Sequence, residues 1–272
     1  FARKRSRSLQ PRTRALASTE TASPMESGQW TRARTATFSA LSTSCKTCRR
    51  CKVYKIGDTW VLHPSPSVVD ILEQGLEYHA GMIDLAASLC SGRRTFVDVG
   101  ACYGLITKQM ASVADRVMAF EPNREIFGCL QKNTETLPNV EVLNCGLGNE
   151  RAQRRLVMYG NDGRSTYRDV PLQTLIKHRR TFRLQDTKTI TLDSLNLEDV
   201  DCIKMDVEGY EKEVVQGSLR TIARCKPVII AEQKAGVIGS KYIPAALELM
   251  GYNLHSVFRG KDYVYVHRQS GH

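Results

Sequence analysis

The chain has 272 residues, and 39 lysine and arginine residues against 28 aspartate and glutamate residues give it a formal net charge of +11. The composition excludes collagen and coiled coils, and no apolar run approaches the ~18 residues of a membrane span. The apolar content of 42% is enough for the core of one large domain. Residues 1–52 hold 12 of the basic but only two of the acidic side chains, so the body from residue 53 onward is close to neutral. The high net charge is therefore a weak indication of nucleic-acid binding, and nucleic acid is not an expected partner.

The leader, residues 1–52, is rich in serine, threonine and arginine and shows no hydrophobic periodicity. Such a segment cannot bury enough apolar surface to offset its ordering entropy, so we expect disorder. Arginine-rich, acid-poor leaders are also typical of organelle transit peptides, which stays open as an alternative to a leader without function.

The nine cysteines fall into two groups. Cys45, Cys48 and Cys51 form a C-x-x-C-x-x-C cluster in the leader, a spacing that could hold an iron–sulfur cluster or part of a zinc site. A fourth ligand is not evident, so no metal is predicted there. The other six stand singly in mixed or apolar segments, which indicates buried thiols in a reducing compartment, and the cytoplasm is the expected location.

From residue 53 onward the pattern becomes that of a folded domain. A hairpin is predicted over residues 53–63 with Gly57-Asp58 as its turn, followed by one helix from Ser65 to Leu89. Strands are then predicted at 95–99, 117–120, 140–143, 202–205 and 227–231, and helices at 103–112, 124–134, 210–222 and 240–250. This alternation predicts an α/β fold with a mostly parallel sheet covered by helices on both faces. The last two strands, 253–258 and 263–267, are too closely linked to be parallel and must form an antiparallel hairpin.

A glycine-containing turn joins the first of the parallel strands to its helix. Asp98 ends an apolar strand, Gly100 allows a sharp turn, and Gly104 allows the helix to pack close to the strand. Free N–H groups at such a helix start suit a carboxylate or a phosphate. The G-x-x-x-G pattern is one glycine short of the dinucleotide motif G-x-G-x-x-G, so alone it is moderately specific.

An acidic residue follows at the end of the next strand. Glu121 lies 21 residues after Gly100 and precedes Pro122. An acid at this position can accept hydrogen bonds from both ribose hydroxyls of an adenosine. Together with the glycine turn, Glu121 predicts a nucleoside-containing cofactor.

These motifs resemble the FkbM family of S-adenosylmethionine-dependent methyltransferases. The resemblance spans roughly residues 75–267 and rests on Asp98–Gly104, Ala119–Pro122, Leu130 with Asn133, Asn144–Gly148, Thr191–Leu195 and Ile203–Glu211, in family order and at family-like spacing. The last of these is its most specific part, and Cys102 stands where the family usually has asparagine. The resemblance implies a Rossmann-like class I methyltransferase fold with a seven-stranded sheet, and S-adenosylmethionine as the cofactor.

On the family's pattern, one group of residues is expected to bind the cofactor: Asp98, Gly100, Ala101 and Gly104 at its amino-acid end, Glu121 at its ribose, and Asn144 and Gly146 beside its adenine. The cofactor's methyl group would pass to an acceptor in line, and an alcohol acceptor must lose a proton as it reacts. FkbM relatives mostly methylate hydroxyls of small molecules, sugars or polyketides, so O-methylation of a sugar, glycan or other small molecule is the predicted activity.

A cluster of acids follows the fourth parallel strand, where open α/β sheets bind their ligands. Asp206 and Glu208 are predicted to be catalytic, since neighbouring buried acids cannot all ionise easily and one of them can serve as a base. Oxygen ligands at this spacing could also hold a divalent cation, although none is predicted. Glu211 is expected only to complement the helix dipole. Glu232, which ends the fifth strand, is a tentative acceptor contact.

Residues 151–188 contain ten basic and three acidic side chains and few core-like patterns. We interpret them as a basic insertion, or lid, that would suit an acidic acceptor, with a solvated basic surface as the alternative. The six histidines lie outside every motif, and His79 in particular is expected to be a surface or packing residue.

Two other functions stay open at this point. A nicotinamide-dependent oxidoreductase would share the strand–turn–helix motif, but the missing middle glycine and the acids at 206–211 disfavour it. A basic, non-catalytic nucleic-acid binder would depend on the leader and the insertion, and its binding would collapse with salt.

Overall fold

The computed structural model describes residues 53–62, 64–75, 77–79, 81–159, 164–168, 170, 172–177, 182–233 and 241–269. All of these belong to one unit that runs from Thr47 to His272. The leader and its cysteine cluster at Cys45, Cys48 and Cys51 lie outside the described residues.

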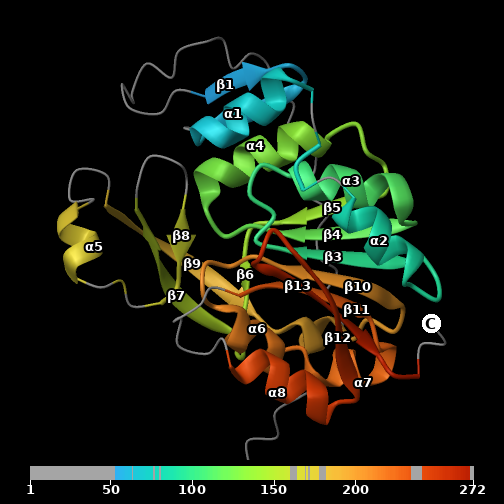
Figure 1. The fold of residues 1–272 in the computed structure, drawn as a ribbon. Coiled ribbons are helices and arrows are strands. Elements are labelled where there is room, and N and C mark those ends of the chain that lie inside the picture. The colour runs from blue at the N-terminus through green and yellow to red at the C-terminus, as the bar shows by residue number, and fades with distance from the viewer. Residues whose placement is uncertain are drawn as a thin grey trace, which may run out of the picture. The chain divides into compact units, whose positions relative to one another are not determined.

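A seven-stranded sheet forms the centre of the domain (Figure 1). Its spatial order is β12-β13-β11-β10-β3-β4-β5. The strands are β3 (Thr95–Val99), β4 (Arg116–Phe120), β5 (Val140–Leu143), β10 (Val200–Met205), β11 (Val228–Glu232), β12 (Tyr252–Phe258) and β13 (Asp262–His267). The pairs from β11 to β5 are parallel, whereas β13 runs antiparallel to both β11 and β12. The mostly parallel sheet and its C-terminal hairpin are thus confirmed.

Helices cover both faces of this sheet. One layer consists of α2 (Met82–Ser88), α3 (Leu105–Val113) and α4 (Arg124–Thr134), and the other of α6 (Glu211–Gln216), α7 (Leu219–Cys225) and α8 (Tyr242–Leu249). Successive strand residues alternate between the two cores: Phe96 packs with the first layer and Val97 with the second. Burial on both faces explains why these strands read as continuous apolar runs.

Two of the predicted helices are each broken into two. The segment expected as one helix from Ser65 to Leu89 forms α1 (Pro66–Glu73) and α2, separated by left-handed backbone at Gly75, His79 and Gly81. The predicted N-cap is present, because Ser65 Oγ accepts a hydrogen bond from the N–H of Val68.

The helix predicted over 210–222 breaks at Gly217 into α6 and α7. A Cβ atom at Gly217 would lie 1.8 Å from the carbonyl oxygen of Gly148. The break therefore lies where the chain packs against another backbone segment.

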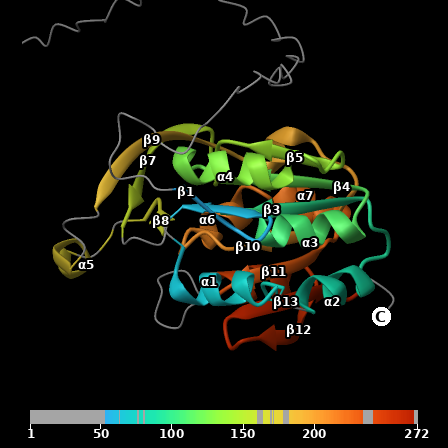
Figure 2. The same ribbon diagram turned by 90° about the horizontal axis from the view of Figure 1, so that it is seen from above.

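The described parts of residues 151–188 form regular secondary structure. They contribute β7 (Ala152–Met158), β8 (Ser165–Thr166) and β9 (Arg183–Ile190) to a second sheet of order β6-β9-β7-β8, whose remaining strand is β6 (Gly146–Leu147), and they also form helix α5 (Leu172–Lys177). Figures 1 and 2 show this sheet standing beside the carboxyl ends of the central strands. Its inner face holds buried threonines as well as Leu156, which is why the pattern did not read as core.

The predicted hairpin is present as β1 (Val53–Ile56) and β2 (Thr59–Leu62). It is fastened to α4 by one side chain: Asn133 accepts a hydrogen bond from the N–H of Trp60 and donates to the carbonyls of Trp60 and Tyr103. The Tyr103 hydroxyl in turn donates to the carbonyl of Leu62. The N-terminal segment is thereby fixed next to the glycine turn after β3.

The predicted single cysteines, Cys90, Cys102, Cys129, Cys145, Cys202 and Cys225, are all free thiols and are buried or half-buried. Among the described residues, no helix has the length and apolar character needed to cross a membrane.

Candidate functional site

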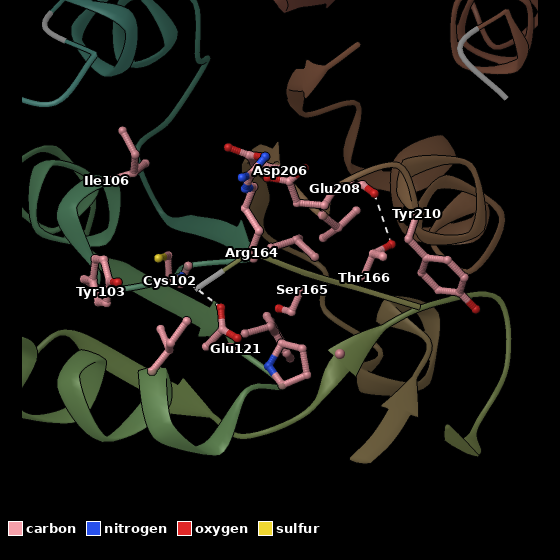
Figure 3. A pocket seen from close by; sticks show the side chains of 18 of the residues that line it. Cys102, Tyr103, Ile106, Glu121, Arg164, Ser165, Thr166, Asp206, Glu208 and Tyr210 are labelled. Atoms are coloured by element: carbon pink, nitrogen blue, oxygen red, sulfur yellow. Dashed lines mark hydrogen bonds between the residues drawn. The ribbon is translucent and has the colours of Figure 1, made fainter. Parts of the chain in front are cut away.

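A cavity of about 270 Å³ opens at the carboxyl ends of β3, β4 and β10 (Figure 3). This is near the lower end of the range of roughly 300–1,000 Å³ for small-molecule sites. Four separate parts of the chain form its walls: the N-terminal segment with Ser65, Val68 and Tyr78; the ends of β3 and β4 from Val99 to Ile106 and at Glu121; the second sheet with Arg164–Tyr167; and the end of β10 with Lys204, Asp206 and Glu208.

The glycine turn brings backbone close to the end of β10. Gly100 has a φ of +81°, and a Cβ atom there would lie 2.1 Å from the carbonyl oxygen of Asp206. Gly104 has a φ of +83°, and its Cβ would lie 2.7 Å from a methyl group of Leu130. Only glycine fits either position, as the sequence indicated. Gly100 and Ala101 line the cavity, whereas Gly104 caps α3 behind it.

Asp98 lies beneath the cavity rather than on its wall. It is fully buried, and one of its carboxylate oxygens accepts a hydrogen bond of 2.6 Å from the Thr107 hydroxyl. The other oxygen has no hydrogen-bond partner among the residues that the structure describes. Burial raises the pKa of Asp98, and the neighbouring Lys204 ammonium opposes that shift. An acid in this position supports the turn and leaves one acceptor atom unused.

Glu121 lines the cavity and is held in place by the backbone. Its two oxygens accept hydrogen bonds from the N–H groups of Cys102, at 3.0 Å, and Asn123, at 2.8 Å. Burial raises the pKa of Glu121 to about 7, despite these two donors. A fixed carboxylate on the cavity wall, next to the glycine turn, is the arrangement expected of a ribose-binding acid.

The two residues expected beside an adenine differ in their placement. Gly146 lines the cavity, and a Cβ there would clash with the ring of Tyr167 at 2.6 Å. Asn144 does not line it; its side-chain amide donates to the backbone carbonyls of Glu121 and Pro122 and so fixes the end of β4.

The acids after β10 form an ordered turn. Asp206 and Glu208 both line the cavity, and Glu208 has a left-handed backbone with a φ of 53°. One oxygen of Glu211 accepts hydrogen bonds from the N–H groups of Val207 and Gly209. Burial raises the pKa of Glu211 to about 7. Glu211 was expected only to complement the helix dipole, but its two hydrogen bonds also fix the turn that carries Asp206 and Glu208.

Lys204 is a cavity residue that the sequence reasoning missed. It is 4% exposed, its ammonium lies 3.6 Å from the Asp206 carboxylate, and it pairs in register with Asp98 across β10 and β3. Burial alone would lower the pKa of Lys204, but Asp206 and Asp98 outweigh it and the net direction is upward, so the ammonium stays charged. A lysine inside the otherwise apolar run from Cys202 to Met205 was the available signal.

Glu232, the tentative acceptor contact, does not line the cavity. It is 4% exposed at the end of β11 and pairs with the ammonium of Lys261. The structure therefore brings Gly100, Ala101, Glu121, Gly146, Asp206 and Glu208 together around the cavity and places Asp98, Gly104, Asn144 and Glu232 outside it.

The second sheet closes one side of the cavity. The Thr166 hydroxyl donates to the carbonyl of Glu208, and Tyr167 packs against Gly146 and Tyr210. Figure 3 shows the Arg164 side chain pointing across the cavity towards Asp206. Part of the segment predicted as a basic lid thus contacts the turn that carries the acids.

The residues present fit a cofactor with a carboxylate end and a ribose. Gly100 and Ala101 line the cavity, the start of α3 has no side-chain cap, and Glu121 offers a fixed acceptor. In the part of the chain that the structure describes, no group of three or more metal-ligating side chains is present.

Comparisons with known proteins identify relatives of this chain. Residues 98–254 match the family model described as the Methyltransferase FkbM domain. Methyltransferase 1 of Beauveria bassiana is 30% identical over 141 residues, which are 44% of this chain and 57% of that protein. This chain therefore spans a little over half of the length of that curated relative.

Solved structures give similar matches. A methyltransferase FkbM from Methylobacillus flagellatus is 18% identical, with 75% of this chain and 55% of that chain covered and a TM-score of 0.41. A SAM-dependent methyltransferase from Aquifex aeolicus is 16% identical, with 74% and 96% covered and a TM-score of 0.41. The family match takes in more than half of the chain, and the sheet has the predicted seven strands with an antiparallel closing hairpin. The chain therefore belongs to the FkbM methyltransferase family and has the class I methyltransferase fold.

Proposed function

We propose that the chain is an S-adenosylmethionine-dependent methyltransferase that methylates a hydroxyl of a sugar, a glycan or another small molecule. The observation that carries the proposal is the cavity itself. The glycine turn and Glu121 form one wall, and Lys204, Asp206 and Glu208 form another. Cofactor-binding groups and acid–base groups thus share one enclosed space, as methyl transfer from a bound donor to a bound acceptor requires.

In this proposal the cofactor is held by the residues around β3 and β4. Gly100, Ala101 and the start of α3 receive its amino-acid end, Glu121 accepts from the ribose hydroxyls, and Gly146 borders the adenine. Asp98, Gly104 and Asn144 support these positions from outside the cavity wall. When bound, S-adenosylmethionine would supply a reactive methyl group on a positively charged sulfur, and the sulfur would leave as a neutral thioether when the methyl group is transferred.

In this proposal, residues at and after the end of β10 remove the proton from the acceptor. Asp206 receives the proton of the acceptor hydroxyl as the oxygen forms its new bond, and Glu208 lies on the same turn to orient that hydroxyl. The Lys204 ammonium, 3.6 Å from Asp206, stabilises negative charge that develops on the acceptor oxygen. Glu211 keeps the turn in shape through its two backbone hydrogen bonds.

The acceptor is expected to be small and could be acidic. Arg164 enters the cavity from the second sheet, and the surrounding residues 151–188 are strongly basic, which favours an acceptor that carries a carboxylate or a phosphate. Glu232 remains a candidate contact for a part of the acceptor that extends beyond the cavity. The six free thiols are consistent with a reducing compartment such as the cytoplasm.

Calorimetric titration of the full chain with S-adenosylmethionine tests the cofactor part of the proposal, with NAD⁺ as the comparison ligand. We expect binding of S-adenosylmethionine only. Glu121→Ala should weaken it about 100-fold or abolish it, because a charged acceptor of two hydrogen bonds is lost. Glu141→Ala, which removes a half-exposed glutamate from neighbouring β5, is the matched control and should leave the affinity unchanged.

An acceptor screen with the methyl-labelled cofactor follows, starting with sugars and sugar phosphates. Transfer of the label to a hydroxyl, lost in Asp206→Asn, would support the assignment. Absence of cofactor binding to folded protein would refute the proposed activity, and transfer to nitrogen or carbon would refute the acceptor class.

A further inference from the structure

A staggered row of buried ionisable side chains crosses four strands at the carboxyl edge of the central sheet. Asp98 and Lys204 are level in register, and Glu232 and Asp262 form the next level two residues further along. Phe96, Cys202, Ile230 and Val264 all pack in the core beneath α2 and α3. Strand residues two apart share a face, so the next positions on that face are Asp98 on β3, Lys204 on β10, Glu232 on β11 and Asp262 on β13. All four are at most 4% exposed. Only Lys204 of this row reaches the cavity wall.

His79 lies over this row, in the break between α1 and α2. It is 6% exposed and has a left-handed backbone with a φ of 57°, which is uncommon for a residue other than glycine. Its ring stacks on that of Tyr78, a cavity residue, with the ring centres 4.2 Å apart. Strained backbone at a buried polar residue is found mainly where function requires it.

His79 and Asp262 are neighbours with unused hydrogen-bonding capacity. His79 Nδ1 lies 3.5 Å from Asp262 Oδ2, and both side chains are almost fully enclosed. Within the described part of the chain, neither ring nitrogen of His79 and neither carboxylate oxygen of Asp262 has a hydrogen-bond partner. Leaving a buried polar atom unpaired costs about 1–3 kcal/mol, so four such atoms in one place are not explained by packing.

The family match does not account for this pair. It covers residues 98–254, whereas His79 precedes that range and Asp262 follows it. The fold brings them together because the segment before α2 covers the edge of the sheet where β13 begins. Both residues therefore lie outside the range that the family model matches.

The surroundings couple the pair to Lys204 and Asp206. The groups that act on the pair come from several neighbouring elements. They are Tyr78 beside it, Lys204 on β10 and Asp206 directly after it, Glu232 on β11, and Arg259 and Lys261 in the turn before β13. Burial, followed by Lys204, lowers the pKa of His79 to about 4, so its ring is neutral at pH 7. Burial raises the pKa of Asp262, and the Lys261 and Lys204 ammonium groups oppose that shift.

We propose that His79 and Asp262 act as a positioning pair for methyl transfer: neutral His79 donates from Nδ1 to the Asp262 carboxylate, and Asp262, together with Asp98, holds the Lys204 ammonium in place against Asp206. The proposal rests on the proposed function, in which Asp206 accepts the acceptor's proton. Neither member of the pair touches the cavity, so both act through Lys204. Their loss would alter the charge and direction of Asp206 rather than the binding of the cofactor.

The first test needs no acceptor. Nitrogen-15 NMR of the His79 ring in the full chain should show a neutral ring at pH 7 with the proton on Nδ1. Lys204→Met should raise the pKa of His79 from about 4 towards its ordinary value of 6.5, whereas Lys188→Met, an exposed lysine on β9, should leave it unchanged. The proposal would be overturned by a proton on Nε2, or by a pKa of His79 that is the same in the wild type and in Lys204→Met. If Lys204→Met does not fold, the tautomer in the wild-type chain still decides.

The second test uses the acceptor found by the screen. Asp262→Asn and His79→Gln should each lower kcat about 10-fold to 100-fold, while KM for S-adenosylmethionine stays within about twofold. Asp262→Asn removes a negative charge that acts on Lys204 and lies close enough to interact with Asp206. It should therefore also shift the acid limb of the rate profile, which is the pH range below which the rate falls. Asp84→Asn, an exposed acid on α2, is the matched control.

The outcomes separate the two proposals. A fall in kcat with an unmoved acid limb would reduce the pair to a structural role and overturn the inference, as would an unchanged kcat. Failure of the wild-type chain to bind S-adenosylmethionine would instead refute the proposed function, and the NMR titration would still report whether His79 and Lys204 are coupled.

Discussion

Ionisation of Glu121 should make the affinity for the cofactor depend on pH. Its pKa is raised to about 7 by burial, and only the ionised carboxylate can accept from two ribose hydroxyls at once. We therefore expect the affinity for S-adenosylmethionine to rise about tenfold between pH 6 and pH 8, as the ionised fraction does. Calorimetry across this range measures it.

Glu121→Gln provides the control for that titration, because it retains any protonation change of the ligand itself. Its affinity should be lower throughout, and its pH dependence should lack the rise near pH 7. Parallel curves for the two proteins would show that Glu121 does not contact the ribose.

Glu211 should affect stability in a pH-dependent way. Its folded-state pKa is about 7 against an ordinary value of 4.5. The stability it contributes is therefore complete below about pH 4.5 and is lost as the pH rises through 7, by at most ~3 kcal/mol. Glu211→Gln keeps a carbonyl oxygen for the N–H groups of Val207 and Gly209 but never ionises. It should match the wild type near pH 5 and exceed it at pH 8 in denaturant unfolding.

Glu213→Gln, in the same turn of α6, is the charge-matched control, because its side chain is not the one that holds Val207 and Gly209. A stability difference between Glu211→Gln and the wild type that does not change with pH would contradict the assignment.

Single residues show where sequence reasoning about the site succeeded. Gly100, Glu121 and Asp206 were predicted because a strand–turn–helix pattern fixes which strand end they occupy, and all three line the cavity. Lys204 and Tyr78 were missed for a different reason. Their roles depend on which strands are neighbours and on how the segment before α2 folds back, and neither is visible in local spacing.

At the scale of elements, the break between α6 and α7 gives a direct test of packing. A methyl group at Gly217 would overlap the carbonyl of Gly148, 1.8 Å away, so one backbone segment must move. We expect Gly217→Ala to lower the free energy of unfolding by about 2–4 kcal/mol. Gly128→Ala, at an exposed position of α4 with no atom within 4 Å of the added Cβ, should instead stabilise by ~0.5–1 kcal/mol. Equal effects in thermal unfolding would contradict the close contact.

The same elements show how far the fold could be predicted. All seven strands of the central sheet and its closing hairpin follow from apolar runs and short connections. The two broken helices did not, because Gly75 and Gly217 interrupt stripes whose apolar spacing continues across them. The second sheet was missed because β9 alternates charged residues with buried threonines, β7 carries two adjacent arginines before its apolar end, and their partner β6 has only two residues.

At the scale of the whole molecule, the cavity depends on parts of the chain that are far apart in sequence. Residues near 65–78, 100–121, 164–167 and 204–210 each supply a wall. A ligand present at about 100 times its Kd adds roughly 2.7 kcal/mol to the stability of the state that binds it. Every segment that the ligand contacts should be stabilised in this way.

We therefore expect S-adenosylmethionine to slow amide hydrogen exchange in all four segments together. Exchange in β12 (Tyr252–Phe258), the edge strand that contributes nothing to the cavity, should not change. Glu121→Ala at the same cofactor concentration should remove the protection everywhere. Protection confined to residues 100–121 would show that the N-terminal segment and the second sheet do not close on the cofactor, and their contacts with the cavity would then serve the acceptor alone.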